Sequence, residues 1–323
     1  MDKLLNDISR LKIFVLGDIM LDRYIFGDVF RISPEAPVPV VSVQSEKYML
    51  GAAANVALNL KVLGVDVQLC GVLGNDSYGS KLEDILRWSG IKIDRNFCVR
   101  ESVSTIVKTR ILVRHQQLCR LDVEQDKISY TFSLKDVKDL LRAKIETSDG
   151  VLISDYAKGV VSSELVNYVE NVAHSLGVFV AMDPKPRNRI FYKNMDLMTP
   201  NKSESMRLAG FDEEAEADDF NPEVVCRNIF EKFSPKNLVI TLGSEGMLLC
   251  HNGEVIDSIP TYASEVFDVS GAGDTSIACL TAAIIAGADL RAAAHFANIA
   301  AGIVVKKLGT SQATADEILN YRG

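Results

Sequence analysis

Short apolar runs alternate along the chain with segments whose apolar residues recur at helical spacing. The apolar run at 12–16 ends at Gly17, and the helical segment at 52–63 ends at Gly64. This alternation predicts an α/β protein with a mostly parallel sheet that helices cover on both faces. We expect strands at 12–16, 65–72, 151–154, 178–182, 196–198 and 238–242, helices at 52–63, 78–88 and 163–175, a hairpin at 246–259, and two Ala-rich helices near the C-terminus.

The segment 24–43 breaks this pattern. Pro34, Pro37 and Pro39 interrupt it, and an alternating run follows at 38–43. Proline is tolerated in edge strands and not in central ones. We therefore expect edge strands outside the main sheet here, and a further strand pair at 105–121.

The bulk composition limits the class of protein. The chain has 323 residues, 47% of them hydrophobic, which allows one large unit with small additions. A net charge of −8 argues against a general nucleic-acid-binding surface. The N-terminus is too polar for a signal peptide, and the longest apolar stretch, 275–288, is too short to span a bilayer. We expect a cytoplasmic protein that binds neither nucleic acid nor membrane.

Two further compositional features predict no site. Six cysteines are scattered without a CxxC pair, so we expect reduced, mostly buried thiols and neither a disulfide framework nor a zinc site. The acidic stretch 212–219 is more typical of a solvated surface loop than of a metal site.

The most informative motif is 268–274, Asp-Val-Ser-Gly-Ala-Gly-Asp, which runs into an apolar helical stretch. The small residues Gly271, Ala272 and Gly273 let backbone N–H groups converge, and the positive end of the following helix points at them. Asp274 would repel a merely bound phosphate, but it suits a reaction that deprotonates a hydroxyl while a phosphoryl group passes to it. The alternative is a tight turn before a core helix.

Polar or glycine-rich loops follow five of the predicted strands. Because ligands of open α/β sheets gather at the carboxyl ends of the strands, these loops are candidates for a site. Asp18 and Asp22 suit sugar hydroxyls, or act as turn and cap residues. Lys158 and Lys185 suit a polyphosphate, or are surface lysines. The other candidates at strand ends are Asp155, Asn201, Glu204, Gly243 and Gly246.

The pair Asn201 and Glu204 has two interpretations. With asparagine as the cap and glutamate three residues later, it fits a helix capping box. The same carboxylate could instead organise the waters of a Mg²⁺ ion, which usually keeps several waters. The residues alone leave both open.

Two segments are candidates for the sugar side of a site. At 50–57 a small-residue run that includes Gly51 lets a ligand approach the backbone, and close helix packing does not explain Asn55. The stretch 102–121 has no acidic residue, and if it is extended, Arg110 and Arg114 point the same way. Two arginines on one face suit a substrate phosphate. The alternative is an edge strand protected by basic residues.

Together these residues resemble the ribokinase (PfkB) family of sugar kinases over about 12–306, with 51–57 and 268–274 as its two signatures. The resemblance implies one ribokinase-like domain over 1–323, with a small β lid built from about 24–44 and 102–121. It implies transfer of the γ-phosphate of ATP, with Mg²⁺, to a sugar hydroxyl. By position it implies a catalytic base at Asp274, an anion hole at Gly271 to Gly273, a magnesium and phosphate motif at Asn201-Lys202-Ser203-Glu204, and a nucleotide loop at Thr241, Gly243 and Gly246.

Within this family the chain is most similar to the D-glycero-D-manno-heptose 7-phosphate kinases. The segments that carry the similarity are 17–24, 31–39, 114–117, 154–159 and 267–274. The similarity implies phosphorylation of the C1 hydroxyl of heptose 7-phosphate to the 1,7-bisphosphate, for the ADP-heptose of the lipopolysaccharide inner core. Ala52 in place of a usual glycine and Val269 in place of a usual threonine depart from the family pattern.

Some relatives carry a nucleotidyltransferase domain behind the kinase. This chain ends soon after its last predicted helix, so we expect it to lack that activity. Lid strands with exposed edges favour a homodimer. Two alternatives stay open: another kinase of the same fold, acting on ribose, fructose or a hexose phosphate, and a non-catalytic sugar- or nucleotide-binding protein.

Overall fold

The structure of the chain is a computed structural model that describes all residues except 115, 212–219, 264 and 322–323. The acidic stretch 212–219, which we expect to be a surface loop, therefore lies outside the described residues. Within the described ranges, no helix is long and apolar enough to cross a membrane.

Nine of the described strands form the main sheet, in the order β15-β14-β13-β12-β11-β10-β1-β4-β6. Neighbours from β13 to β6 pair in parallel, and β14 and β15 add an antiparallel hairpin at one edge. The central strands β1 and β10 are buried along nearly their whole length, because helices cover both of their faces. The main-sheet strands are β1 (Lys12–Gly17), β4 (Asp66–Cys70), β6 (Lys92–Ile93), β10 (Gly150–Ser154), β11 (Phe179–Asp183), β12 (Leu197–Met198), β13 (Asn237–Thr241), β14 (Met247–His251) and β15 (Glu254–Ile259).

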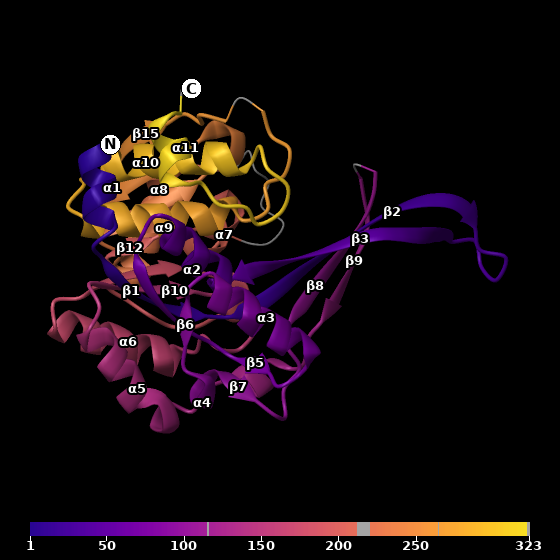
Figure 1. Cartoon of the computed structure of the whole chain (residues 1–323). Helices are drawn as coiled ribbons and strands as arrows, with labels where there is room; N and C mark the ends of the chain where they lie inside the picture. The colour runs from indigo at the N-terminus through magenta and orange to yellow at the C-terminus, as the bar shows by residue number, and fades with distance from the viewer. Residues whose placement is uncertain (115, 212–219, 264, 322–323) are drawn as a thin grey trace.

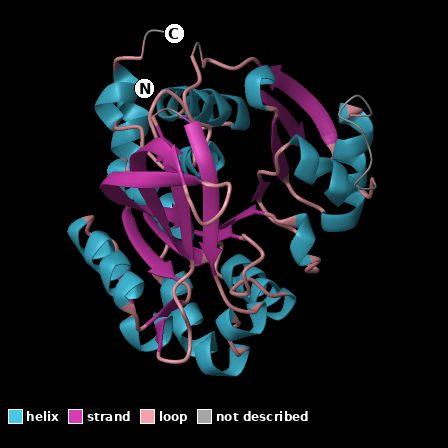
Figure 2. Cartoon of the chain, turned by 90° about the vertical axis from the view of Figure 1, so that its right-hand side faces the viewer, coloured by secondary structure: helices cyan, strands magenta, loops and turns pink. Residues whose placement is uncertain are grey.

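Helices flank this sheet, as Figures 1 and 2 show. The small-residue helices α2, α9 and α10 lie on one side, and α5 and α6 pack together on the other. The prediction of a mostly parallel α/β sheet flanked by helices is confirmed. The helices are α1 (Asp2–Ile8), α2 (Ala53–Val62), α3 (Ser77–Trp88), α4 (Arg95–Cys98), α5 (Leu134–Glu146), α6 (Ser163–Ser175), α7 (Lys202–Ala209), α8 (Pro222–Phe233), α9 (Ala272–Ile285), α10 (Leu290–Val304) and α11 (Ala315–Leu319), and the short strands β5 (Leu73–Gly74) and β7 (Val99–Arg100) pair with each other.

A second sheet, which we call the arm, has the strand order β3-β2-β8-β9. Its distal half projects from the body of the molecule (Figure 1). Its proximal half is anchored in the core, where Leu21 and Leu50 are buried, whereas Phe30 near the tip is 78% exposed. The edge strands predicted outside the main sheet lie here, but β2 and β3 are longer than predicted because they continue into the body. The arm strands are β2 (Ile19–Ile32), β3 (Pro39–Ala52), β8 (Val107–Val113) and β9 (Gln116–Val123).

The prediction of reduced thiols is wrong for one pair of cysteines. Cys226 of α8 and Cys250 of β14 form a disulfide, with their Cα atoms 6.6 Å apart. The two residues meet because α8 packs beside the β14–β15 hairpin, a proximity that no CxxC spacing signals. The remaining cysteines, Cys70, Cys98, Cys119 and Cys279, carry free thiols.

Candidate active site

The N-terminus of α9 is shaped to hold an anion. Gly271 caps the helix with a φ of 80°, and a Cβ there would lie 2.8 Å from Nδ2 of Asn55, so the position favours glycine. The N–H groups of Gly273 and Asp274 lie in the first turn, where no intrahelical acceptor is available. A Cβ on Gly273 would meet nothing within 4 Å. Gly271, Ala272 and Gly273 therefore form a helix start that faces open space and can hold a negatively charged group.

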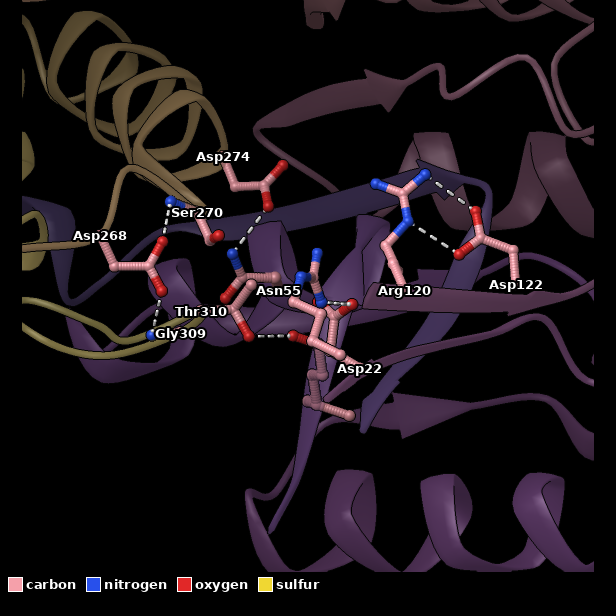
Figure 3. Close-up of polar contacts among 11 residues, drawn as sticks. Asp22, Asn55, Arg120, Asp122, Asp268, Ser270, Asp274, Gly309 and Thr310 are labelled. Atoms are coloured by element: carbon pink, nitrogen blue, oxygen red, sulfur yellow. Dashed lines mark hydrogen bonds and ion pairs between the residues drawn. The ribbon is translucent and has the colours of Figure 1, made fainter. Parts of the chain in front are cut away.

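Asp274 lies in this first turn and is 2% exposed. One carboxylate oxygen accepts a 2.7 Å hydrogen bond from Nδ2 of Asn55 (Figure 3), and the other accepts a 2.7 Å hydrogen bond from the hydroxyl of Tyr156. Burial raises the pKa of Asp274 to about 6, and the two hydrogen bonds oppose that rise. The carboxylate is therefore mostly ionised at neutral pH. Each oxygen keeps a lone pair that can accept a substrate proton.

A buried polar network fixes Asn55. Its backbone carbonyl accepts a 2.9 Å hydrogen bond from Nδ2 of Asn59, and its side-chain oxygen accepts a 3.0 Å hydrogen bond from Nε2 of Gln312. The Thr275 hydroxyl donates to Asn59 at 2.9 Å. These bonds turn the amide NH₂ of Asn55 toward Asp274. Asn55 is buried and orients the Asp274 carboxylate, and its predicted contact with the substrate stays a prediction.

Asp18 is also predicted to bind a sugar hydroxyl, and in the structure it contacts the loop after β10. It is wholly buried and accepts hydrogen bonds from the backbone N–H groups of Tyr156 (2.9 Å), Lys158 (3.0 Å) and Val160 (3.0 Å). Burial raises the pKa of Asp18, and these three bonds oppose the rise. Both of its oxygens are therefore occupied by the loop after β10. Asp18 therefore shapes that loop, and its role toward a sugar hydroxyl stays a prediction.

Asp155, a third predicted substrate residue, joins two loops at strand ends. It accepts hydrogen bonds from the N–H of Ala157 (2.7 Å) and from Nδ2 of Asn188 in the loop after β11 (3.1 Å). Burial raises its pKa to about 7. Asp155 therefore links the loops after β10 and β11, and its predicted contact with the substrate stays a prediction.

Asp183 ends β11, and its carboxyl group lies near those of Glu204 and Asp274. Burial raises its pKa well above the usual value, and the nearby charges of Glu204 and Asp274 raise it further. The strand ends thus gather several carboxyl groups at one edge of the sheet. A polyphosphate can bind beside them only when cations lie between the negative charges.

The arm contributes an ion pair to the site. Oδ1 of Asp22 on β2 lies 2.6 Å from Nη1 of Arg110 on β8, and the two side chains are 5% and 16% exposed. Gly51 on β3 permits this arrangement, because a Cβ there would lie 2.7 Å from Oδ2 of Asp22. The structure therefore brings three predicted substrate residues, Asp22, Gly51 and Arg110, into one cluster.

Arg114 does not belong to that cluster. It lies in the turn after β8 with a φ of 55°, and it lines a groove on the distal arm together with Val29 and Leu118. The prediction that Arg110 and Arg114 share a strand face is wrong, because β8 ends at Val113 and the turn breaks the alternation. Lys108 shares the face of Arg110 instead, and its ammonium lies 5.4 Å from the ring centroid of Tyr156.

The two lysines predicted to bind polyphosphate are both ion-paired. Lys158 pairs with Glu124, which directly follows β9. Lys185 pairs with Glu204 and lies 5.7 Å from the ring centroid of Tyr156. Lys185 thus stands among the carboxyl groups at the strand ends, whereas Lys158 faces the base of the arm.

Asn201 and Glu204 form a capping box at the start of α7. The N–H of Asn201 donates to Oε2 of Glu204 at 3.0 Å, and the N–H of Glu204 donates to Oδ1 of Asn201 at 2.9 Å. Between them, Lys202 pairs with Glu245 at 3.5 Å, and Ser203 is exposed. The capping interpretation is therefore correct. It is compatible with a metal role, since the box holds the Glu204 carboxylate beside Lys185 and near Asp183.

The donors in this region fit a cation held through water. Across the part of the chain that the structure describes, no three His, Cys, Asp or Glu side chains converge into a direct metal site. Mg²⁺ commonly keeps several waters and binds through one or two carboxylates together with substrate phosphates. Glu204 and Asp183 are the carboxylates whose positions suit that arrangement.

A cavity of about 320 Å³ opens beside the start of α9. The predicted nucleotide-loop residues Thr241, Gly243 and Gly246 line it, and so does Gly273. Its other walls are mostly small or apolar, which suits a flat heterocyclic ring. Val269, one of the two departures from the family pattern, lies in this wall. The cavity therefore ends where the helix N-terminus could receive a phosphate.

Three residues close to Asp274 or Asn55 have no role predicted from the sequence. Tyr156 lies within 154–159, and Lys108 lies within 102–121. Both segments were predicted to belong to the site, although neither residue was singled out. Gln312 is 257 residues away from Asn55 along the chain, and only the fold brings them together.

A carboxylate at a helix N-terminus, beside a cavity at the carboxyl ends of parallel strands, has the parts that phosphoryl transfer to a hydroxyl requires. Fold, site and relatives together define an ATP-dependent carbohydrate kinase. The chain belongs to the pfkB family of carbohydrate kinases, whose family model matches residues 10–317.

Two relatives show how far the similarity extends. Bifunctional protein HldE of Haemophilus influenzae (strain PittEE) is 42% identical over 320 residues, which cover 97% of this chain and 64% of the relative. Bifunctional protein HldE of Histophilus somni (strain 129Pt) is 40% identical over 314 residues, with the same coverage of 97% and 64%. The chain thus spans about 64% of the length of these relatives.

Solved structures share the fold at lower sequence identity. Arabidopsis thaliana ribokinase complexed with ribose and ATP has a TM-score of 0.73 at 20% identity, covering 96% of this chain and 97% of its own. Phosphofructokinase-2 from Escherichia coli in complex with substrates and products has a TM-score of 0.74 at 17% identity, with the same coverage of 96% and 97%. The fold is therefore ribokinase-like.

Proposed function

We propose that this kinase transfers the γ-phosphate of ATP to the C1 hydroxyl of D-glycero-D-manno-heptose 7-phosphate. The product is the 1,7-bisphosphate, an intermediate toward the ADP-heptose of the lipopolysaccharide inner core. The resemblance of segments such as 154–159 and 267–274 to heptose 7-phosphate kinases supports this substrate. So does the 42% identity to a protein named HldE.

One observation carries the proposal: Asp274 lies between two differently built half-sites. On one side is the cavity with Thr241 and Gly243 in its wall, which suits the nucleotide. On the other side is the arm, with the Asp22–Arg110 pair and Lys108. A guanidinium is the side chain best suited to a phosphate, which fits a sugar that already carries one.

In this reaction Asp274 accepts the proton of the C1 hydroxyl while the C1 oxygen forms a bond to the γ-phosphorus. The bond between that phosphorus and the β–γ bridging oxygen breaks, and ADP leaves. Backbone N–H groups at the start of α9, those of Gly273 and Asp274, stabilise the charge on the transferring group. The proton on Asp274 then passes to solvent after the bisphosphate is released.

Glu204 would hold Mg²⁺ through water, near Asp183 and Lys185. A bound Mg²⁺ supplies positive charge that neutralises the β- and γ-phosphate oxygens. Lys185 adds a fixed positive charge in the same region, which offsets the carboxyl groups gathered there.

The arm would act as a lid and as a dimer interface. As a lid it would exclude water and suppress ATP hydrolysis.

The edge strands of the arm, β3 and β9, have unpaired backbone groups, and Val43 and Leu121 are apolar and exposed on them. A homodimer would cover these edges. Sedimentation at assay concentration should give a dimer, and a monomer with full activity would contradict this part of the proposal.

The substrate is tested by a kinase assay across a panel of sugars and sugar phosphates, with ³¹P NMR of the product. We expect D-glycero-D-manno-heptose 7-phosphate to give the highest kcat/KM, with the new phosphate on C1. Faster turnover of ribose, fructose or a hexose phosphate would assign the chain to another substrate of the same family. No turnover with any of them, despite ATP binding, would favour a binding protein.

A further inference from the structure

Tyr156 lies at the meeting point of the site. Its hydroxyl donates a 2.7 Å hydrogen bond to Oδ1 of Asp274. Its ring lies under two ammonium groups, that of Lys108 at 5.4 Å and that of Lys185 at 5.7 Å from the centroid. Lys108 comes from the arm. Lys185 comes from the loop after β11 and pairs with Glu204. One side chain thus contacts both half-sites and the carboxylate between them.

The loop that carries Tyr156 is held from several directions. Asp18 accepts hydrogen bonds from the N–H groups of Tyr156, Lys158 and Val160, all at 2.9 to 3.0 Å. Ala157 has a φ of 57°, and Gly159 has a φ of 125° with its Cα so close to Lys127 that a Cβ would lie 2.1 Å from the Lys127 carbonyl oxygen. The positive φ of Ala157, which is not a glycine, persists only where the surroundings fix the backbone. The loop therefore holds the Tyr156 hydroxyl in place against Asp274.

We propose that Tyr156 is a positioning residue, which orients the Asp274 carboxylate and keeps it ionised for proton transfer. This inference rests on the proposed role of Asp274 as the base. Two donors, one per oxygen, fix the carboxylate plane, and neither donor alone would prevent rotation about the Cβ–Cγ bond. Tyr156 also leaves the second lone pair of Oδ1 available for the substrate hydroxyl.

Burial, hydrogen bonds and nearby charges together set the pKa of Asp274. Lys108 favours the ionised carboxylate, whereas Asp22 and Asp183 disfavour it. Burial is the largest influence and raises the pKa to about 6, while the hydrogen bonds from Asn55 and Tyr156 lower it. Removing the Tyr156 hydroxyl removes one stabilising bond to the charged form. The pKa of Asp274 should then rise. As the pH is lowered, the variant should therefore lose activity at a higher pH than the wild type does.

The test is the pH profile of kcat/KM for Tyr156→Phe. Phenylalanine keeps the ring beneath Lys108 and Lys185 and removes only the hydroxyl. We expect the acidic limb to move upward by about one to two pH units, the size expected for one hydrogen bond to a charged group. Activity should recover toward the wild-type value at pH above the new limb.

Tyr192→Phe is the matched control. The Tyr192 side chain is 2% exposed, and its hydroxyl has no hydrogen-bond partner in the structure as described. The same substitution there should leave the pH profile unchanged. Calorimetric ATP binding and thermal melting of both variants show whether each is folded with an intact nucleotide side.

Two results would overturn the inference. A Tyr156→Phe profile that superimposes on the wild type would show that the hydroxyl does not act on the base. A loss of the same factor at every pH would assign Tyr156 a purely structural role. Failure of the proposed base is a separate outcome, because it would appear as activity retained in Asp274→Asn, whatever Tyr156→Phe does.

Discussion

The two half-sites that we propose for the nucleotide and for the sugar differ in composition. The nucleotide side consists of backbone and small residues around a cavity of about 320 Å³, with Gly243, Gly246 and Gly273 in its wall. The sugar side consists of charged side chains from the arm, such as Asp22 and Arg110, which pair at 2.6 Å. Figure 3 shows Asn55 and Asp274 beside Asp22 at the boundary.

From this difference we infer which half-site determines the choice of sugar. Backbone N–H groups at a helix N-terminus can bind the phosphates of any nucleoside triphosphate, because they recognise negative charge and shape. Paired side chains on a separate sheet can change their partner without disturbing the main sheet. We therefore expect substitutions on the nucleotide side to act on turnover with every sugar, and substitutions on the sugar side to act on the choice of sugar.

Asp274→Asn should give the largest effect, since Asp274 lies between the two proposed half-sites. The substitution keeps the shape of the side chain and removes the proton acceptor. General-base catalysis contributes about 10²–10⁴-fold, so kcat should fall by that factor while ATP affinity stays nearly unchanged. Stopped-assay kinetics and calorimetry measure the two quantities. A variant that retains more than a tenth of the wild-type kcat would refute the base assignment.

Gly273→Ala should separate stability from turnover on the nucleotide side. Alanine stabilises a helix by roughly 0.5–1 kcal/mol relative to glycine, and a Cβ here would meet no atom within 4 Å. The methyl group would instead occupy the space in front of the helix N-terminus. We expect a melting temperature that is unchanged or raised, with kcat/KM reduced about tenfold for every sugar tested. Unimpaired kinetics would show that no phosphate approaches Gly273.

Glu204→Gln should give the smallest effect. Glutamine keeps the capping-box geometry with Asn201 but removes the charge beside Lys185. The Mg²⁺ concentration that gives half-maximal activity should rise by up to about fivefold, equivalent to roughly 1 kcal/mol. A titration of activity against Mg²⁺ measures it. An unchanged titration with slightly altered thermal stability would leave Glu204 as a helix cap only.

The sequence predicts the turn and the helix starts of the proposed nucleotide side, because the signals for them are local. The glycines of 268–274 and the cap at Asn201 act within a few residues of one another, so their spacing already specifies the turn and the helix start. The strand-and-helix alternation likewise predicts the main sheet. Ala52, noted as a departure from a usual glycine, has a φ of 53°, which explains why glycine is usual there.

The sugar side could not be predicted in the same way, since its contacts are long-range. Arg110 and Asp22 are 88 residues apart in the sequence, and the pairing of β2 with β8 brings them together. Because β8 ends at Val113, Arg114 lies outside this pair. The hydrogen-bond partners of the buried carboxylates could not be predicted for a related reason. Asp18 looks like a ligand at a strand end, but it accepts backbone N–H groups of a loop about 140 residues later, such as that of Lys158.

The most direct test of the account is the ratio of kcat/KM for heptose 7-phosphate to that for unphosphorylated heptose. It should be measured in the wild type, in Arg110→Ala and in Arg114→Ala. A ratio cancels general damage to the site, because damage lowers both terms. We expect a wild-type preference for the phosphorylated sugar that falls about 10- to 150-fold in Arg110→Ala, the range for losing a hydrogen bond to a charged group, and that persists in Arg114→Ala. An unchanged ratio in Arg110→Ala, or a wild-type enzyme that accepts both sugars equally, would contradict the assignment of the arm to the substrate phosphate.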